Sequence, residues 1–275
     1  MSNHFSKFNL PTHQNDLPRP AGIASFMRLP ISSLKETASL DACVVGVPVD
    51  TATSNRPGTR FGPREIRTES VMVRPRSNWT GENPFTRIQV ADIGDVVASL
   101  YNVKAACDSI TEQYTEIFSS GCVPVTLGGD HLITYPILRA AAKTHGPLAV
   151  IHVDAHSDTA PAMMGERLAH GTPFRCAWED GILDNSRVAQ LGLRGTGWSH
   201  GDVGWGREQG WRVVQAEECW HKSLDSLMEE IRNQMGDRPL YLSFDIDAID
   251  PGFCPGTGTP EIGGLTSIQA LEIIR

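Results

Sequence analysis

Three short segments of the sequence concentrate side chains that bind divalent cations. They are Gly128-Gly129-Asp130-His131, Asp154-Ala155-His156-Ser157-Asp158 and Asp245-Ile246-Asp247. Each segment follows a largely apolar run of strand length, so each is expected at the end of a strand. Residues two apart on an extended chain point to the same side, so Asp154 and His156 form one pair of neighbouring ligands. Asp245 and Asp247 form a second pair by the same argument.

The six candidate metal ligands combine four carboxylates with two imidazoles. They are His131, Asp154, His156, Asp158, Asp245 and Asp247. Four carboxylates in one apolar-backed crevice repel one another and raise one another's pKa unless cations neutralise them. This donor set suits two Mn²⁺ ions that share bridging carboxylates. A single Asp or His at a strand end is more often a cap or a packed residue, so only the set of three segments indicates a metal site.

Hydrophobic patterning predicts the elements that position these residues. From residue 41 onward, short β-branched runs alternate with longer amphipathic stretches, which is typical of βα units around a parallel sheet. We expect seven strands, at 41–49, 88–95, 122–128, 148–156, 187–194, 211–217 and 239–247. Helices are expected at 103–119, 224–235 and 267–274. The stretch 50–63 is rich in glycine and proline and is expected to be a long loop or surface turn, followed by a helix that opens at Pro63. The sequence therefore predicts an α/β protein, a three-layer α-β-α fold with a mostly parallel sheet, and a site at the carboxyl ends of its strands.

Composition excludes several classes of function and partner. The 275 residues include 24 basic and 32 acidic side chains, a formal net charge of −8, without a run of basic residues, so we expect no nucleic-acid partner. The apolar runs have the length of strands, so we expect no membrane partner. Six cysteines without paired spacing favour a reducing compartment, and we expect a cytoplasmic protein, with an organelle left open. The proline-rich residues 1–35 predict an irregular N-terminal arm, followed by one domain at 36–275.

The sequence resembles the ureohydrolases, the family of arginase, agmatinase and the guanidino-acid hydrolases. Four segments carry the resemblance: 128–131, 154–158, 243–251 and 255–260, the last reading Pro-Gly-Thr-Gly-Thr-Pro. The resemblance implies an arginase/deacetylase-like fold and two Mn²⁺ ions per chain. It implies that His131, Asp154, Asp158 and Asp245 hold one ion and that Asp154, His156, Asp245 and Asp247 hold the other, with Asp154 and Asp245 bridging. It also implies a homo-oligomer, a trimer or hexamer.

The activity that this resemblance implies is hydrolysis of a guanidino group to urea and an amine. Two cations stabilise hydroxide near neutral pH, and hydroxide attacks the trigonal guanidinium carbon. His170 matches the histidine proposed to relay a proton in the family, and His170 and Asp158 are the candidate catalytic residues. His152 lies two residues before Asp154 in an apolar run, which favours a core residue or a group that supports the ligands.

One feature of the family is expected to be missing. Related enzymes carry, on an eighth strand, a glutamate that binds the guanidinium, whereas this sequence ends at Arg275 within the helix expected at 267–274. We therefore expect a C-terminally incomplete domain or a shortened homologue. Glu261 lies nearby in sequence but does not match the missing position. A metal-binding scaffold without activity is the alternative function that this absence would suit.

The substrate is expected to be a linear guanidino compound from arginine catabolism or polyamine metabolism. Segments 20–30, 54–63 and 215–220 resemble the agmatinase and guanidinobutyrase branch more than arginase, and the loop 162–166 resembles guanidinobutyrases. The sequence thus favours 4-guanidinobutyrate, with agmatine and guanidinopropionate as alternatives. Met163 could pack against the methylene chain. Arg56 and Arg60 could pair with a substrate carboxylate, although solvated cations or local salt bridges would explain them too.

Overall fold

The computed structural model describes residues 7–197 and 201–275 and divides into two compact units. The first unit contains Met1–Asp50 and Gly58–Gly129, and the second contains Thr51–Pro57 and Asp130–Arg275. All six candidate metal ligands belong to the second unit. The expectation that 36–275 forms one domain stays a prediction.

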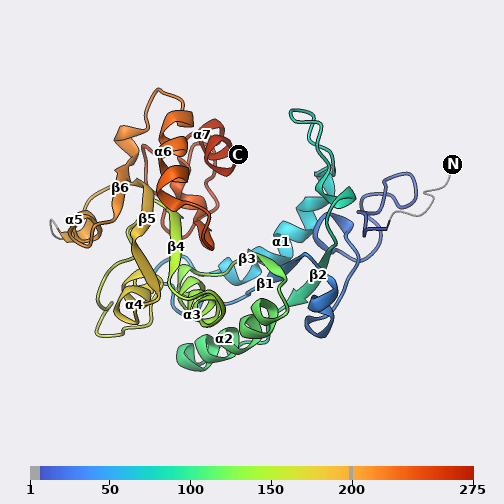
Figure 1. Ribbon diagram of the computed structural model, residues 1–275, viewed down its shortest axis with the longest axis horizontal. Helices are drawn as coiled ribbons and strands as arrows, with labels where there is room; N and C mark the ends of the chain where they lie inside the picture. Colours follow the sequence, from blue (N-terminus) through green and yellow to red (C-terminus); the bar gives the residue numbers. More distant parts are fainter. Residues whose placement is uncertain (1–6, 198–200) are drawn as a thin grey trace. The chain divides into compact units, whose positions relative to one another are not determined.

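The described residues form seven strands in two parallel sheets (Figure 1). The strands are β1 (Ala42–Gly46), β2 (Val90–Asp95), β3 (Val123–Leu127), β4 (Leu148–Val153), β5 (Leu183–Leu193), β6 (Arg212–Gln215) and β7 (Leu240–Phe244). The first unit holds the order β2-β1-β3, and the second holds β6-β5-β4-β7. The predicted α/β class and the positions of the seven strands are confirmed, although β5 begins earlier than expected, at Leu183. The one sheet that we expected is described as two, so β3 and β7 are edge strands within the described residues.

The predicted helices at 103–119, 224–235 and 267–274 and the one opening at Pro63 are present, and the structure adds α3, α4 and α5. The helices are α1 (Gly62–Glu69), α2 (Val103–Ser119), α3 (Thr134–His145), α4 (Pro173–Glu179), α5 (Gly201–Glu208), α6 (Asp225–Met235) and α7 (Ser267–Ile274). Short 3₁₀ helices are η1 (Phe26–Arg28), η2 (Leu34–Ser39), η3 (Thr59–Phe61), η4 (Ser70–Met72), η5 (Pro84–Thr86), η6 (His131–Ile133), η7 (Ala216–Glu218) and η8 (Ile246–Ala248). Side-chain caps fix helix starts, as at α2, where Asn102 accepts from the backbone N–H of Ala105. Among the described residues, no helix has the length and apolarity needed to cross a membrane.

The first unit buries both faces of its central strand β1, whereas Val123 and Val125 of β3 are exposed. On one face, Val44 and Leu127 pack with Leu29 from the N-terminal segment. On the other face, Tyr114 of α2 contacts Thr126 of β3 through their hydroxyl groups at 2.7 Å. Residues 7–33 are irregular apart from η1 and an isolated bridge at Ile31, and residues 1–6 of the predicted arm lie outside the described residues. Part of the predicted arm thus contributes to this core.

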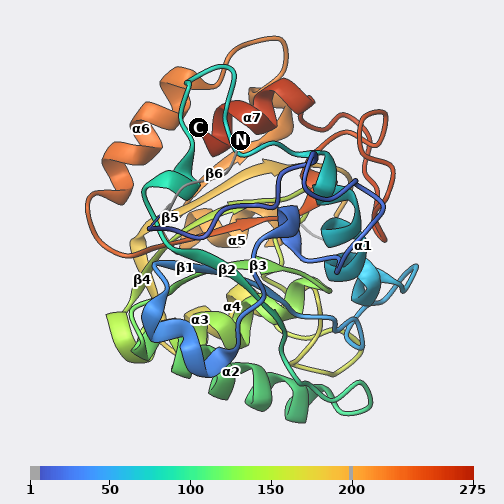
Figure 2. The same ribbon diagram turned by 90° about the vertical axis from the view of Figure 1, so that its right-hand side faces the viewer.

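The second unit is a three-layer arrangement around β4, which is buried along its whole length. Ile151 and its alternate neighbours on β4 pack with Ile231 of α6 and Ile273 of α7. His152, which points to the opposite face, lies against the ring of Phe174 on α4, with ring centroids 4.0 Å apart. Figure 2 shows α6 and α7 on one side of these strands and α3 and α4 on the other. The carboxyl ends of β4 and β7, which pair in parallel, therefore lie side by side.

Candidate metal centre

Local structure brings the three predicted segments to one end of the sheet of the second unit. Asp154, His156 and Asp158 follow the last residue of β4, and Asp245 follows the last residue of β7. Asp245 caps η8, because its Oδ1 accepts from the N–H of Asp247 at 3.1 Å. Because β4 and β7 pair in parallel, the residues that follow the two strands are neighbours, as the sequence predicts.

Asp130 has a different role from the other acidic residues of these segments. Its Oδ1 accepts from the N–H of Leu132 at 3.0 Å and caps η6, and its Oδ2 accepts from the N–H of Ala52 at 2.9 Å. This capping places His131 as the first residue of η6. Asp130 thus supports the position of His131.

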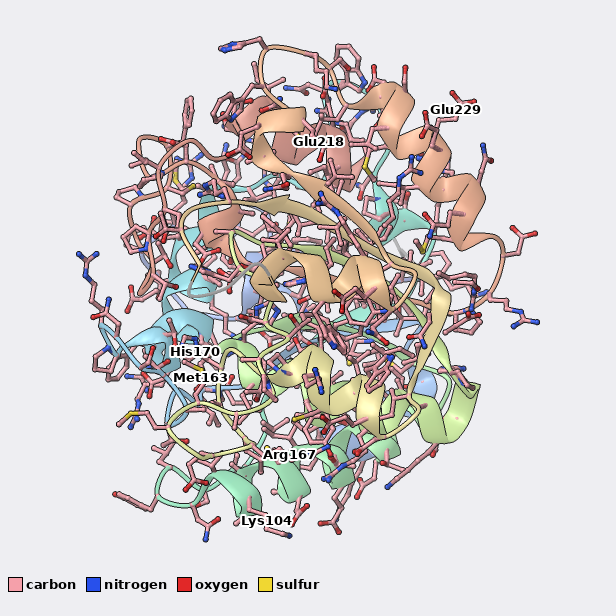
Figure 3. All side chains as sticks on the ribbon, turned by 90° about the vertical axis from the view of Figure 1, so that its left-hand side faces the viewer. Lys104, Met163, Arg167, His170, Glu218 and Glu229 are labelled. Atoms are coloured by element: carbon pink, nitrogen blue, oxygen red, sulfur yellow. The ribbon has the colours of Figure 1, made fainter. Side chains whose placement is uncertain are left out.

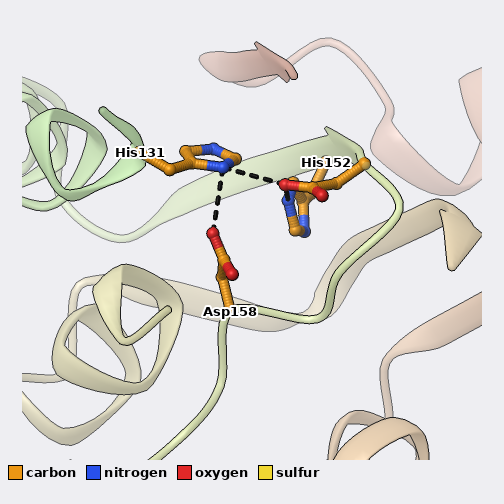
Figure 4. A group of neighbouring side chains, drawn as sticks. His131, His152 and Asp158 are labelled. Carbon is orange, nitrogen blue, oxygen red and sulfur yellow. Dashed lines mark hydrogen bonds and ion pairs between the residues drawn. The ribbon is translucent and has the colours of Figure 1, made fainter. Parts of the chain in front are cut away.

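His131 forms the first cluster with three aspartates. Its Nδ1 atom lies 2.8 Å from Oδ2 of Asp154, 3.0 Å from Oδ2 of Asp158 and 3.3 Å from Oδ2 of Asp245. The side chain of His131 is 7% exposed, and those of Asp154 and Asp158 are equally enclosed. Figure 4 shows the contact of His131 with Asp158 and the position of His152 beside them. Three carboxylate oxygens thus lie within 3.3 Å of one imidazole nitrogen. The ligand atoms of His131, His152, Asp154 and Asp158 lie close enough to one another to hold a metal ion.

His156 forms the second cluster, which shares Asp154 with the first. Its Nδ1 lies 3.4 Å from Oδ1 of Asp154 and 3.1 Å from Oδ2 of Asp247. Asp154 therefore turns Oδ2 toward His131 and Oδ1 toward His156. A carboxylate whose two oxygens serve two ligand groups has the geometry of a bridge between two ions.

The chemistry of His131 fits a cation. Its Nδ1 is buried and makes no hydrogen bond in good geometry within the described residues, although three carboxylate oxygens surround it. Its Nε2 lies 2.7 Å from Oγ of Ser243 on β7. When the ring is neutral and donates Nε2–H to this hydroxyl, Nδ1 presents a lone pair to the carboxylates, and a cation is needed between them. Without a metal ion, burial opposes charge on His131, but the carboxylates of Asp154 and Asp158 raise its pKa well above 6.5. The residues present therefore fit a divalent metal ion.

Electrostatics in the metal-free protein show how strongly the site attracts positive charge. Burial, together with the charges of Asp154 and Asp245, raises the pKa of Asp247 to about 7. Burial opposes charge on His156, but its hydrogen bonds to Asp154 and Asp247 raise its pKa to about 11. Protons thus occupy the site when cations do not, and metal binding has to displace them.

A buried arginine holds the loop that carries Asp247. Arg194 follows β5, is 8% exposed, and donates from Nη2 to the carbonyl oxygen of Asp247 at 2.6 Å. It also donates to the carbonyls of Ala248 and Glu261. Thr259 donates its hydroxyl to Oδ2 of Asp247 at 3.0 Å. The motif 255–260 therefore supports a candidate ligand through Thr259.

His170 lies beside the loop of residues 51–57, within the second unit. Its Nε2 is 2.7 Å from Oγ of Ser54, and its N–H donates to the carbonyl of Ala52 at 3.2 Å. Met163 lies close to His170 (Figure 3) and packs on Gly171, where a Cβ atom would meet its sulfur at 2.9 Å and Oδ1 of Asp158 at 3.8 Å. The predicted catalytic histidine and the predicted apolar contact are therefore neighbours.

The two predicted carboxylate-binding arginines have different surroundings. Arg60 belongs to the first unit and forms an ion pair with Asp50, whose Oδ2 also accepts from the N–H of Gly58 at 2.7 Å. Arg56 belongs to the second unit, is exposed, and has no ion pair within the described residues. Arg56 is thus the one whose charge is available to a ligand.

Sequence reasoning missed the residues that support the ligands. These residues are far in sequence from the groups that they bind. Ser243 is 112 positions from His131, and Thr259 and Arg194 are 12 and 53 positions from Asp247. The alternation of strand residues offered one signal, because Ser243 precedes Asp245 by two positions and points to the same side. No comparable local pattern marks Arg194.

The raised pKa of Asp247 predicts how the stability of the metal-free protein changes with pH. Between its ordinary pKa of 3.8 and about 7, the folded protein binds more protons than the unfolded chain, so stability falls as pH rises. The raised pKa of His156 also makes stability fall as pH rises, between pH 6.5 and about pH 11. We expect the melting temperature in excess chelator to fall from pH 5.5 to pH 8, and to fall less in Asp247→Asn. An equal pH dependence in both proteins would contradict this prediction.

Comparison with known proteins agrees with this site. A family model described as the Arginase family matches residues 40–275. The chain is 58% identical over 266 residues to a guanidinobutyrase of Pseudomonas aeruginosa, covering 96% of this chain and 83% of the relative. It is 56% identical over 270 residues to a mitochondrial agmatinase of Gallus gallus, and the match covers 98% of this chain and 79% of the relative. The solved structure of proclavaminate amidino hydrolase from Streptomyces clavuligerus superposes with a TM-score of 0.87 at 40% identity. The match covers 94% of this chain and 84% of the solved chain. The chain therefore belongs to the arginase family.

Proposed function

We propose that this protein is a two-manganese hydrolase that cleaves 4-guanidinobutyrate to urea and 4-aminobutyrate. The observation that carries the proposal is the position of Asp154, whose two oxygens face the two histidines of adjacent ligand clusters. Relatives that share more than half of their aligned residues with this chain are named as a guanidinobutyrase and an agmatinase. Both names describe hydrolysis of a guanidino compound.

The ligands divide between two ions in this proposal. His131, Asp158 and Asp245 surround the first position, His156 and Asp247 surround the second, and Asp154 is shared. Asp245 is the proposed second bridge. Carboxylates and imidazoles without thiolates suit Mn²⁺.

The residues around the clusters have distinct proposed roles in the reaction. When bound, two divalent cations make hydroxide available near neutral pH as the nucleophile for the guanidinium carbon. The C–N bond to the alkyl amine breaks, and the departing amine needs a proton. His170 is the proposed donor of that proton, and Ser54 holds its Nε2 at 2.7 Å. Asp158 lies between His131 and the Met163–Gly171 contact, and so borders both the ions and the proposed substrate chain.

The substrate assignment rests on the apolar and cationic groups near His170. Met163 presents a flexible thioether, which adapts to a methylene chain. Arg56, on the same loop as Ser54, offers a cation to a substrate carboxylate. Agmatine carries a second cation in place of the carboxylate, so Arg56 disfavours it. The cytoplasmic location and the trimeric or hexameric assembly stay predictions.

The proposed bridge predicts the pattern of metal loss in variants. We expect about two Mn²⁺ ions per wild-type chain by elemental analysis after removal of unbound metal. Asp154→Ala removes ligands from both positions, so it should lose both ions, whereas His131→Ala should retain about one. Glu229→Gln is the control, because Glu229 is an exposed carboxylate on α6, and this variant should retain both ions. One ion per wild-type chain at saturating Mn²⁺ would contradict the two-ion site.

The proposed proton donor predicts a specific loss of rate. His170→Asn should keep both ions and lose roughly 10²- to 10⁴-fold in kcat for urea release, because general acid–base catalysis typically contributes that much. Ser54→Ala should lose less, since the ring remains. Metal content and kcat are measured on the same preparations. A near-normal rate of His170→Asn from pH 7 to 9 would eliminate His170 as the proton donor.

The role of Arg56 predicts a change of preference between substrates. Arg56→Met should raise KM for 4-guanidinobutyrate by about ten- to a hundredfold, as expected for a lost charge-assisted hydrogen bond. It should lower KM for agmatine, because the repulsion between two cations is removed. Arg60→Met is the control, because Arg60 already pairs with Asp50, and it should not separate the two substrates. Wild-type protein that turns over agmatine faster than 4-guanidinobutyrate at equal concentration would refute the carboxylate assignment.

A further inference from the structure

His152 is a buried histidine that the proposed reaction does not use. It is fully buried on β4, and its Nε2 lies 2.8 Å from Oδ2 of Asp154. Asp154 is the carboxylate that faces both ligand clusters. The direction of the hydrogen bond between His152 and Asp154 therefore matters for the site. A neutral imidazole donates from only one of its nitrogens, so its other neighbours decide which one.

Gln190 on β5 fixes the direction of that hydrogen bond. Its Nε2 lies 2.8 Å from the carbonyl oxygen of Ser157, which can only accept. The amide nitrogen must therefore face Ser157, and its second N–H is directed at Nδ1 of His152 at 2.9 Å. The amide oxygen of Gln190 is buried without a donor within the described residues. This orientation leaves an acceptor unsatisfied, so the two N–H contacts are what hold the amide in place.

These contacts give a chain of hydrogen bonds with one direction, in which Gln190 donates to His152 and His152 donates to Asp154. Nδ1 of His152 accepts from Gln190 in this arrangement, so Nε2 carries a proton and donates it to Asp154. The other oxygen of Asp154, Oδ1, accepts from the N–H of His156 at 2.6 Å. Each carboxylate oxygen of Asp154 is thus held by one N–H donor. Its remaining lone pairs face His131 and His156.

We propose that Gln190 and His152 are positioning residues that orient the Asp154 carboxylate between the two metal positions. In the metal-free protein the pair sets the rotation of the shared candidate ligand through hydrogen bonds. His152 lies in one of the groups that could hold a metal ion, and in this proposal it acts through its hydrogen bond to Asp154. Partners of metal ligands typically change metal affinity about 10- to 100-fold when they are removed. The inference rests on the proposed two-ion function, but the hydrogen-bond direction exists in the metal-free protein too.

Three variants separate the hydrogen bond from the packing around it. His152→Phe keeps a ring against Phe174 and removes the donor to Asp154. His152→Gln removes the ring but can place an amide N–H near the position of Nε2. Phe174→Leu loosens the packing of His152, whose ring centroid lies 4.0 Å from that of Phe174, and keeps the donor. Mn²⁺ affinity is measured by electron paramagnetic resonance titration of the metal-free proteins, with circular dichroism to verify folding.

We expect His152→Phe to weaken Mn²⁺ binding about 10- to 100-fold, and His152→Gln to recover most of that loss. Phe174→Leu should stay within about threefold of wild type, because metal affinity follows the donor to Asp154. Equal affinity of His152→Phe and wild type would overturn the inference, and so would equal loss in His152→Phe and His152→Gln. Wild-type protein that binds no Mn²⁺ would instead overturn the proposed function.

The tautomer of His152 gives a readout that needs no metal. In ¹⁵N-histidine spectra of the metal-free wild type, the His152 signal, identified by its absence in His152→Gln, should show an unprotonated Nδ1 and a protonated Nε2. Gln190→Leu removes the donor to Nδ1, so signal of the opposite tautomer should rise and Mn²⁺ affinity should fall. A wild-type ring protonated on Nδ1, or an unchanged spectrum in Gln190→Leu, would refute the proposed chain of donors.

Discussion

The concentration of negative charge around Asp154 is the constraint on which the rest of the site depends. Asp154 is almost fully buried, and three further aspartates lie within reach of the histidines that contact it. Such a group of carboxylates is stable only with positive charge among them. The raised pKa of Asp247 is the sign of that requirement in the metal-free protein. Two divalent ions would meet it, and they would also supply the hydrolytic chemistry of the proposed function.

The protein surrounds this charge with directed hydrogen bonds in place of neutralising side chains. Ser243 contacts His131, Thr259 donates to Asp247, and Arg194 binds the carbonyl oxygen of Asp247 in preference to its carboxylate. A lysine or arginine paired directly with these carboxylates would compete with the metal ions for the same lone pairs. Hydrogen bonds to the backbone carbonyls and to the outer atoms of the candidate ligands fix the positions of these side chains. They leave the attraction of the carboxylates for cations in place. Rigid placement and strong cation binding are compatible for this reason.

Hydrogen bonds hold together the proposed proton donor, the loop of residues 51–57 and a segment that supports a candidate ligand, all within the second unit. The loop of residues 51–57 contacts His170 through Ala52 and Ser54, and Asn55 donates to the carbonyl of Gly258 at 2.7 Å. Gly258 belongs to the segment that contains Thr259, which donates to Asp247. One connected set of contacts thus joins Arg56, His170 and a metal ligand. Substrate preference and metal binding are therefore expected to depend on the same loops.

The sequence by itself determined the strands, several of the helices and the set of candidate ligands. Continuous apolar runs and helical spacing placed β4, α2 and α7, because burial of these elements requires those periodicities. The pairs formed by Asp154 with His156 and by Asp245 with Asp247 followed from strand geometry, since residues two apart share a side. These are local properties of a chain segment, and no tertiary contact is needed to read them.

Only the tertiary structure decided how the ligands are oriented and supported. The division of the oxygens of Asp154 between His131 and His156, and the donor chain from Gln190 through His152, depend on side chains from different strands and loops. The same holds for the difference between Arg56 and Arg60, which local sequence makes look alike, although only Arg60 finds a partner in Asp50. Hydrogen-bond direction and ion pairing depend on separations of a few ångströms, and the register and packing of β4, β5 and β7 set those separations.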